Sequence, residues 1–343
     1  MKNTNKKVSR REFVRNMSEG VAGLSIPFVM SSCKNDKTIV TEQTNSTEQK
    51  KQLPGGPGYR RADDLVPRHV LGKTGLEVSR LAFGGGSQFM KNKDGDWEPL
   101  VQKALELGIN YFDTHYDYVG SEERFAELLN PVRDQVIIST KFDARTVSGM
   151  QNEFEVSLKR LKTDYVDILM IHSIEEKDSV SQIENGVYKE MLKLKEQGTV
   201  RYIGFSSMNS AKRSKDLLEN LDFDVVILAL NPTTYGNFAT VALPSAVKKN
   251  VGVLAMKVMR NVVGVAATAE ELMHYALDKE GVCTALIGHY GMNILEENAE
   301  LAKKFAADTL IRDWSALEKS CKPYAGPHAL CWARDDYYDG KMV

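Results

Sequence analysis

Between residues 80 and 289, short apolar runs alternate eight times with longer amphipathic segments. The apolar runs are nearly continuous, which is typical of strands in a parallel sheet that is buried on both faces. Eight strand–helix repeats favour closure into a barrel over an open sheet. We therefore expect an α/β fold, a (β/α)8 TIM barrel. The expected strands are RLAFGGG, NYFDTH, VIISTKF, YVDILMIHS, VRYIGFSS, VVILALN, GVLAMKV and GVCTALIGH.

The barrel is expected to span residues 64–312, within a chain of 343 residues. It begins with a β-hairpin, His69–Val78, that turns at Lys73-Thr74-Gly75. A C-terminal extension, residues 313–343, is rich in aromatic side chains. These fit either a lid over the barrel mouth or packing against the outside of the barrel. The aromatic residues are Trp314, Tyr324, Trp332, Tyr337 and Tyr338.

The first 63 residues do not resemble part of a folded domain. Residues 1–33 combine a basic start that contains Arg10 and Arg11, a short apolar stretch, and Ser31-Ser32-Cys33. This pattern resembles a twin-arginine export signal that ends in a lipoprotein cleavage site, so Cys33 is a candidate for lipidation and membrane attachment. Residues 34–63 are polar and then Pro/Gly-rich, which predicts a disordered tether. The alternative is a cytoplasmic protein with a disordered tail and a chance arginine pair.

Charge and cysteine content exclude several classes of function. The net charge is -1 and the pI is about 6.6, and no clustered basic face indicates nucleic-acid binding. The four cysteines form no CxxC pair, so we expect no metal site. Cys283 lies in an apolar run and is expected to be buried. Cys321 and Cys331 form either a disulfide or two free thiols.

Four polar residues each stand where a predicted strand ends. Asp113 and Tyr118 follow NYFDT, Lys141 follows VIIST, and His172 follows VDILMI. In a (β/α)8 barrel the carboxyl ends of the strands carry the active site. Each residue alone is more easily explained as structural, but an acid, a phenol, an amine and an imidazole together indicate proton-transfer chemistry and an enzyme.

These motifs, over residues 66–305, resemble the aldo-keto reductase family. LGKTGLEVSRLAFGGG resembles the family's bottom hairpin and first strand, and GINYFDTHYDYVGSEERFAELL resembles the segment with the catalytic Asp and Tyr. The lysine and histidine after the next two strands also match, as do VRYIGFSSM and the helix that contains Glu297-Asn298. The resemblance implies a nicotinamide cofactor, NADP or NAD, and a carbonyl or sugar-like small-molecule substrate.

The resemblance also implies catalytic roles. Tyr118 is the proton donor to the carbonyl oxygen, and the five-residue step from Asp113 selects it over its rivals Tyr111 and Tyr116. Lys141 is expected to lower the pKa of the Tyr118 phenol, with Asp113 holding the lysine in place. His172 orients the carbonyl by a hydrogen bond to its oxygen.

The expected cofactor-binding residues depart from the family pattern at several positions. Ser207 stands where many members have Asn, Ile227 where Gln is expected, and Ile294 where a basic residue often grips a 2′-phosphate. Lys257 is a candidate for the pyrophosphate or an exposed rim lysine. His115 stands where the family often has a small residue, and it is a candidate to narrow the pocket or contact substrate. The full set of expected cofactor-binding residues is Ser206, Ser207, Lys257, Gly288, Gly291, Asn293, Glu297 and Asn298.

The expected function is hydride transfer between a nicotinamide and a carbonyl or alcohol. The alternative is a non-catalytic cofactor-binding or regulatory barrel protein. The sequence does not identify the substrate, the preference between NAD and NADP, or the oligomeric state, because specificity in this fold resides in loops.

Overall fold

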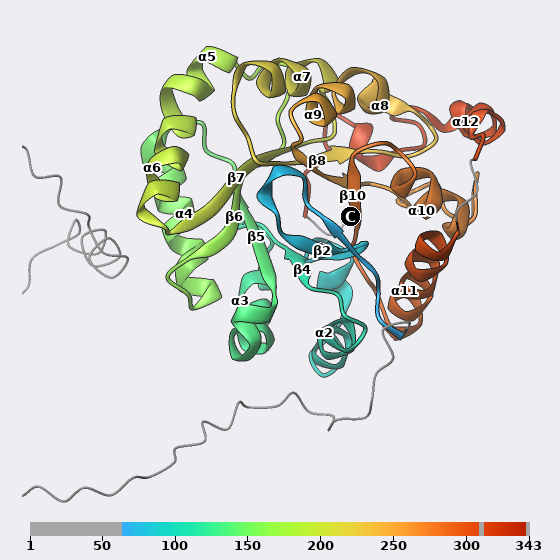
Figure 1. Ribbon diagram of the computed structural model, residues 1–343, viewed down its shortest axis with the longest axis horizontal. Helices are drawn as coiled ribbons and strands as arrows, with labels where there is room; N and C mark the ends of the chain where they lie inside the picture. The colour runs from blue at the N-terminus through green and yellow to red at the C-terminus, as the bar shows by residue number, and fades with distance from the viewer. Residues whose placement is uncertain (1–63, 309–311, 341–343) are drawn as a thin grey trace, which may run out of the picture.

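The computed structural model describes residues 64–308 and 312–340, so the expected signal and tether lie outside the described residues. Eight parallel strands form a closed barrel in the order β10-β3-β4-β5-β6-β7-β8-β9 (Figure 1). The predicted (β/α)8 barrel is therefore confirmed. The strands are β3 (Leu81–Gly84), β4 (Tyr111–Asp113), β5 (Ile137–Phe142), β6 (Val166–Ile171), β7 (Val200–Ser207), β8 (Val225–Ala229), β9 (Gly252–Met256) and β10 (Val282–Ile287).

Helices surround this barrel and cover the outer face of its strands (Figure 1). Their buried positions recur at helical spacing, and glycines such as Gly198 (φ 77) end them in the left-handed conformation that glycine adopts without strain. The α-helices are α2 (Trp97–Glu106), α3 (Ser121–Leu129), α4 (Val147–Leu161), α5 (Val180–Ile183), α6 (Lys189–Gln197), α7 (Ala211–Asn220), α8 (Phe238–Val241), α9 (Leu243–Lys248), α10 (Ala269–Leu277), α11 (Met292–Ala307) and α12 (Ser315–Cys321).

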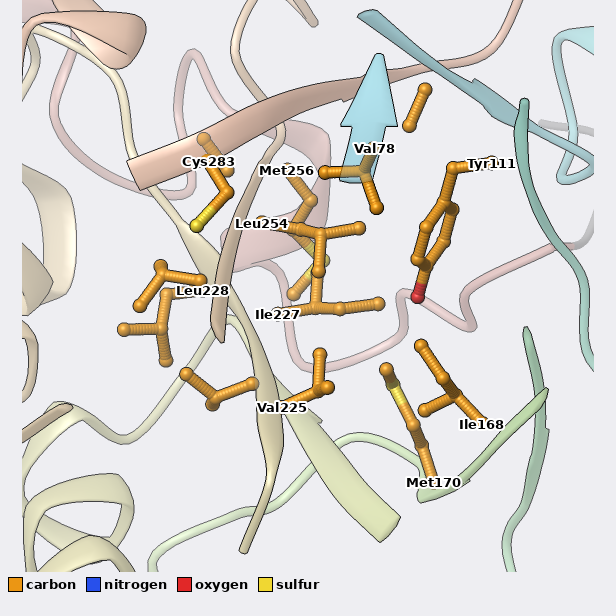
Figure 2. Close-up of a cluster of buried hydrophobic side chains, with 14 of the residues drawn as sticks. Val78, Tyr111, Ile168, Met170, Val225, Ile227, Leu228, Leu254, Met256 and Cys283 are labelled. Atoms are coloured by element: carbon orange, nitrogen blue, oxygen red, sulfur yellow. The ribbon is translucent and has the colours of Figure 1, made fainter. Parts of the chain in front are cut away.

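The predicted hairpin closes the amino-terminal end of the barrel. Its strands β1 (Arg68–Val70) and β2 (Glu77–Ser79) pair antiparallel. The backbone N–H of Lys73 donates to the carbonyl of Asn250, just before β9 begins. Val78 points inward among side chains from the strands (Figure 2). Sealing this end leaves the opposite end of the barrel, where the strands finish, as the open mouth.

Apolar side chains fill the barrel interior, so the barrel is a packed core rather than a pore. Ile168, Val225, Ile227 and Leu254 come from three strands and are all buried (Figure 2). Cys283 on β10 is buried as predicted, with 3% of its surface exposed. Among the described residues, no helix is long and apolar enough to cross a bilayer.

The C-terminal extension packs against the outside of the barrel in its first part and lies at the barrel mouth in its last part. Its first part packs outside the barrel, where Trp314 contacts Tyr275 of α10 edge to face at 5.7 Å. Trp332 is fully buried, and the segment after it, residues 334–340, reaches the barrel mouth. Cys321 and Cys331 are free thiols, so the structure has no disulfide between them.

Candidate active site

A cavity of about 610 Å³ opens at the carboxyl ends of the strands. It is lined by the glycine loop after β3, by catalytic candidates, by the loop after β9, by the start of α11 and by the C-terminal segment. This size falls within the range of pockets that bind small molecules and cofactors. The predicted residues Asp113, Tyr118, Lys141 and Ser206 all line it.

Asp113 and Lys141 form a buried ion pair. They lie at the ends of the neighbouring strands β4 and β5, and Lys141 Nζ is 2.6 Å from Asp113 Oδ2. The lysine also donates to the carbonyl of Thr114 at 2.7 Å, and Ser139 donates to the other Asp113 oxygen at 2.7 Å. Both charged side chains are nearly inaccessible, so the lysine is held in one position.

Tyr118 is the tyrosine that faces the cavity. Lys141 Nζ lies 5.3 Å from the centre of its ring. Its rival Tyr111 is buried in the barrel interior (Figure 2), and neither Tyr111 nor Tyr116 lines the cavity. Of the three candidate tyrosines, Tyr118 is the one that lies at the cavity, and its role as proton donor stays a prediction.

His172 is oriented by a carboxylate that follows the neighbouring strand. Its Nδ1 lies 2.7 Å from Asp143 Oδ1, and Asp143 comes directly after β5 as His172 comes directly after β6. Burial alone would lower the pKa of His172, but the hydrogen bonds to Asp143 and Asp339 outweigh it, so the pKa is raised above 6.5. His172 then donates from Nδ1 to Asp143 and presents Nε2–H to Asp339, and it lines a smaller neighbouring pocket rather than the cavity itself.

Asp339, from the C-terminal segment, occupies the centre of this arrangement. Its Oδ2 accepts a 2.7 Å hydrogen bond from the Tyr118 hydroxyl and lies 3.4 Å from His172 Nε2. Its Oδ1 is 2.5 Å from Lys257 Nζ and accepts a 2.7 Å hydrogen bond from the Tyr337 hydroxyl. Burial opposes ionisation of Asp339, but the charges of Lys257 and His172 outweigh it and hold the pKa of the carboxyl well below its usual range. Asp339 is therefore an anion in the catalytic position.

The pKa of the Tyr118 phenol shifts in the direction opposite to the one expected. We expected Lys141 to lower the pKa of the phenol. In the structure, burial and the negative charge of Asp339 raise the pKa of Tyr118 well above 10. The phenol is thus protonated and donates to the carboxylate.

His115 lies beside the catalytic residues rather than in the cavity. Its ring centre is 4.0 Å from that of His172 and 5.0 Å from that of Tyr118. Burial and the neighbouring His172 lower the pKa of His115 to about 3, so it is neutral. His115, Asp143 and His172 each bring a possible metal-ligand atom, all within 4.8 Å of one another. The hydrogen bond between Asp143 and His172 already accounts for much of this closeness.

The expected cofactor-binding residues divide into two groups. Ser206, Lys257, Gly288 and Asn298 line the cavity. Ser207 does not line it: the residue is fully buried, and its hydroxyl donates to the carbonyl of Ile174 at 2.7 Å. Gly291, Asn293 and Glu297 also lie outside the lining and stay predictions.

Asn298 supplies the clearest sign that this cavity fits a nucleotide. Its side chain is buried, it lines the cavity, and its Nδ2 has no hydrogen-bond partner in the structure. A buried amide donor without a partner is costly, and a ligand group could satisfy it. Ile294, one helical turn earlier, also lines the cavity and is 44% exposed, so α11 presents no cation there.

Three residues of the site were missed from the sequence. Asp143 stands two residues after Lys141 and could have been found as a second polar residue at the same strand end. Arg260 lines the cavity and donates to the hydroxyl of Ser87 at 2.7 Å. It follows Lys257 by three residues in the loop after β9. Asp339 carries no local signal, because its role depends on where the tail folds.

Comparisons with known proteins agree with this geometry. The model of the Aldo/keto reductase family matches residues 80–307. L-galactose dehydrogenase of Arabidopsis thaliana is 35% identical over 158 residues, which is 42% of this chain and 49% of that protein. D-threo-aldose 1-dehydrogenase of a Pseudomonas species is 27% identical over 233 residues, covering 57% of this chain and 70% of that protein. The chain thus spans about half the length of the first of these relatives.

Solved structures show the same barrel. A crystal structure of an aldo-keto reductase from Pseudomonas aeruginosa superposes with a TM-score of 0.61 at 25% identity, covering 71% of this chain and 98% of that one. The holo form of an aldo-keto reductase from Bacillus halodurans, at 18% identity, shares the fold with a TM-score of 0.60 over 76% of this chain and 96% of that one. Because the family model matches more than half of the chain, and the barrel carries Asp113, Tyr118, Lys141 and His172 at its mouth, this protein belongs to the aldo/keto reductase family.

Proposed function

We propose that the chain is a nicotinamide-dependent oxidoreductase that interconverts a carbonyl and an alcohol, with Tyr118 as the proton donor. One observation carries the proposal. The Tyr118 hydroxyl and His172 Nε2 converge on a single oxygen position, held in this structure by Asp339 Oδ2. A substrate carbonyl oxygen at that position would be within reach of one proton donor and one hydrogen-bond donor.

The cofactor, NADP or NAD, supplies the hydride when it is bound. Ser206, Gly288 and Asn298 would hold it along the cavity, and Arg260 is placed to contact a phosphate. The protein's own contribution is positional and electrostatic. The Lys141 ammonium, which Asp113 holds in place 5.3 Å from the centre of the Tyr118 ring, would stabilise negative charge on the Tyr118 oxygen once its proton has moved to the substrate. His172, fixed by Asp143, stabilises the developing charge on the carbonyl oxygen.

The substrate is proposed to be a small carbonyl compound or a sugar. Two relatives are named for the oxidation of aldoses. The polar donors at the cavity floor suit a ligand with several oxygens.

Titration with NADPH and with NADH tests the proposal directly. Micromolar binding of either, followed by its oxidation with an aldehyde, would support an oxidoreductase. If neither nicotinamide bound and mass spectrometry found none retained, the proposal would be wrong and a non-catalytic barrel protein would take its place.

We further propose that residues 1–33 direct export by a twin-arginine route and that Cys33 is lipidated, which would place the enzyme in the periplasm or on a membrane. The support is the sequence pattern alone. Fractionation of cells that express wild type and Arg10→Lys/Arg11→Lys tests the route. Metabolic palmitate labelling of wild type and Cys33→Ser tests the anchor, and a soluble, unlabelled wild type would contradict it.

A further inference from the structure

A carboxylate is bound at the reacting centre by donors on both of its oxygens. Oδ2 of Asp339 faces Tyr118 and His172, and Oδ1 faces Lys257 and Tyr337. Three of these donors belong to the barrel or its own loops. The barrel mouth is therefore complementary to a ligand with two oxygens close together. Tyr118 and His172 contact one oxygen, and Lys257 contacts the other.

Lys257 is built to hold an anion at this place. It follows β9 directly, its side chain is 8% exposed, and Asp339 is the acidic partner found for it among the described residues. Its backbone has a φ of 58°, which is strained for a lysine, and its carbonyl accepts a hydrogen bond from Asn231 at 3.2 Å. Backbone strain of this kind persists where the surroundings enforce it, often at ligand sites.

Asp339 must leave before a carbonyl oxygen can reach Tyr118 and His172. Departure of the tail removes the carboxylate that neutralises the Lys257 ammonium at the cavity wall. A neutral carbonyl compound can replace the hydrogen bonds but not the charge. An anionic ligand replaces both, so the site favours a substrate that carries its own negative charge next to the reacting carbon.

We propose that the substrate class is a 2-oxo acid or the corresponding 2-hydroxy acid, including sugar acids of this type, and that Lys257 is the residue that selects its carboxylate. This deepens the proposed function and rests on it. The ketone oxygen takes the place of Asp339 Oδ2, and a carboxylate oxygen takes the place of Oδ1. In the reducing direction, C2 gains a hydride from the reduced nicotinamide and its oxygen gains the Tyr118 proton. The C=O bond becomes C–OH, and the carboxylate is unchanged.

The rival role for Lys257, a contact to the cofactor pyrophosphate, fits the distances less well. Lys257 Nζ and the Tyr118 hydroxyl contact the two oxygens of one carboxylate. The nicotinamide carbon must lie within about 3–3.5 Å of the reacting carbon, and a ribose separates that ring from the pyrophosphate. A lysine this close to the reacting oxygen is better placed for the substrate. Arg260 also lines the cavity and does not contact the Asp339 carboxylate, so it is the better candidate for the pyrophosphate.

Calorimetric binding of lactate and of lactamide tests the proposal, because the two probes have nearly the same shape and differ in charge. The proteins are full-length wild type, Asp339→Ala, Asp339→Ala/Lys257→Met, and Asp339→Ala/Lys319→Met as a control at an exposed lysine of α12. We expect Asp339→Ala to bind lactate about 10- to 100-fold more tightly than lactamide, as charge-assisted hydrogen bonds do. Lys257→Met should abolish that preference, and Lys319→Met should leave it unchanged. Wild type should show the same preference at lower affinity, because lactate must displace Asp339.

Equal affinity for lactate and lactamide would overturn the proposal, and wild type alone gives this answer if Asp339→Ala does not fold. A Lys257→Met variant that loses NADPH or NADH affinity but keeps its lactate preference would overturn it in favour of the pyrophosphate. Failure of the proposed function has a separate signature. A lactate preference that depends on Lys257, in a protein that binds neither nicotinamide, would keep the carboxylate site and exclude the oxidoreductase.

Discussion

The Tyr118 hydroxyl donates a 2.7 Å hydrogen bond to the carboxylate of Asp339, which comes from the last described segment of the chain. Gly340 allows the tail backbone to approach the Tyr118 ring closely. Its φ is 90°, and a Cβ placed on it would lie 2.1 Å from the Tyr118 ring, so a larger residue would not fit. The tail therefore lies directly on the catalytic tyrosine, and its carboxylate takes the position proposed for a substrate oxygen.

Removing this carboxylate should increase activity on neutral substrates. We expect Asp339→Ala to raise kcat/KM for a small neutral aldehyde by about tenfold or more, because the tail loses the charge-assisted hydrogen bonds that hold it over Tyr118. Steady-state assays compare it with Asp335→Ala, an exposed aspartate of the same segment. A similar kcat/KM in all three proteins would show that the tail does not compete with substrate.

Asp113 should be important for stability as well as for activity. Asp113→Asn removes one partner of a buried pair and should cost about 3–5 kcal/mol of unfolding free energy. Glu155→Gln is a matched control, because Glu155 and Lys159 are also 2.6 Å apart but Lys159 is 70% exposed. That change should cost less than about 1 kcal/mol. Urea denaturation of the two variants measures the difference, and equal losses would contradict a special role for burial.

The contribution of His172 to stability should depend on pH. Its pKa is raised above 6.5 by Asp143 and Asp339, against the effect of burial. A raised pKa means that the contribution is fully present below the unfolded value of 6.5 and is lost as the pH rises through the folded value. Unfolding free energies of wild type and His172→Gln should therefore differ most near pH 6 and converge at higher pH. If the difference in unfolding free energy between wild type and His172→Gln grew with rising pH, the pKa of His172 would not be raised in the folded protein.

Ile294 offers a test of cofactor preference. An arginine at this position would present a planar fork of donors to a 2′-phosphate. We expect Ile294→Arg to tighten NADPH binding relative to NADH by about tenfold. Ile294→Gln adds polarity without charge and should leave the ratio nearly unchanged. Fluorescence titration of wild type and the two variants with both nucleotides gives six dissociation constants, and an equal effect of Arg on NADPH and NADH would place the 2′-phosphate elsewhere.

The fold and the central catalytic group could be read from the sequence because both depend on local patterns. Continuous apolar runs such as VVILA specify strands buried on both faces, and a polar residue after each run must face the barrel mouth. This places Asp113 beside Lys141 without further information, because their strands are neighbours.

The rest depended on packing between distant parts of the chain. Asp339 reaches Tyr118 across 221 residues, and no periodicity in the tail predicts where an irregular segment will lie. The expected lowering of the Tyr118 pKa was wrong because burial of the hydroxyl and the negative charge of Asp339 raise that pKa instead, and both depend on how the chain packs. Ser207 was assigned to the cofactor by its place in a motif, but its hydroxyl is used by the carbonyl of Ile174.

The most direct test of the central claim is oxidation of bound NADPH or NADH by an aldehyde panel, compared between wild type and Tyr118→Phe. The variant keeps the ring but loses the proton donor. We predict that it binds the nicotinamide as tightly as wild type while its kcat falls by about 100-fold or more. Undiminished turnover in Tyr118→Phe would show that another group protonates the substrate and would contradict the assignment of this site.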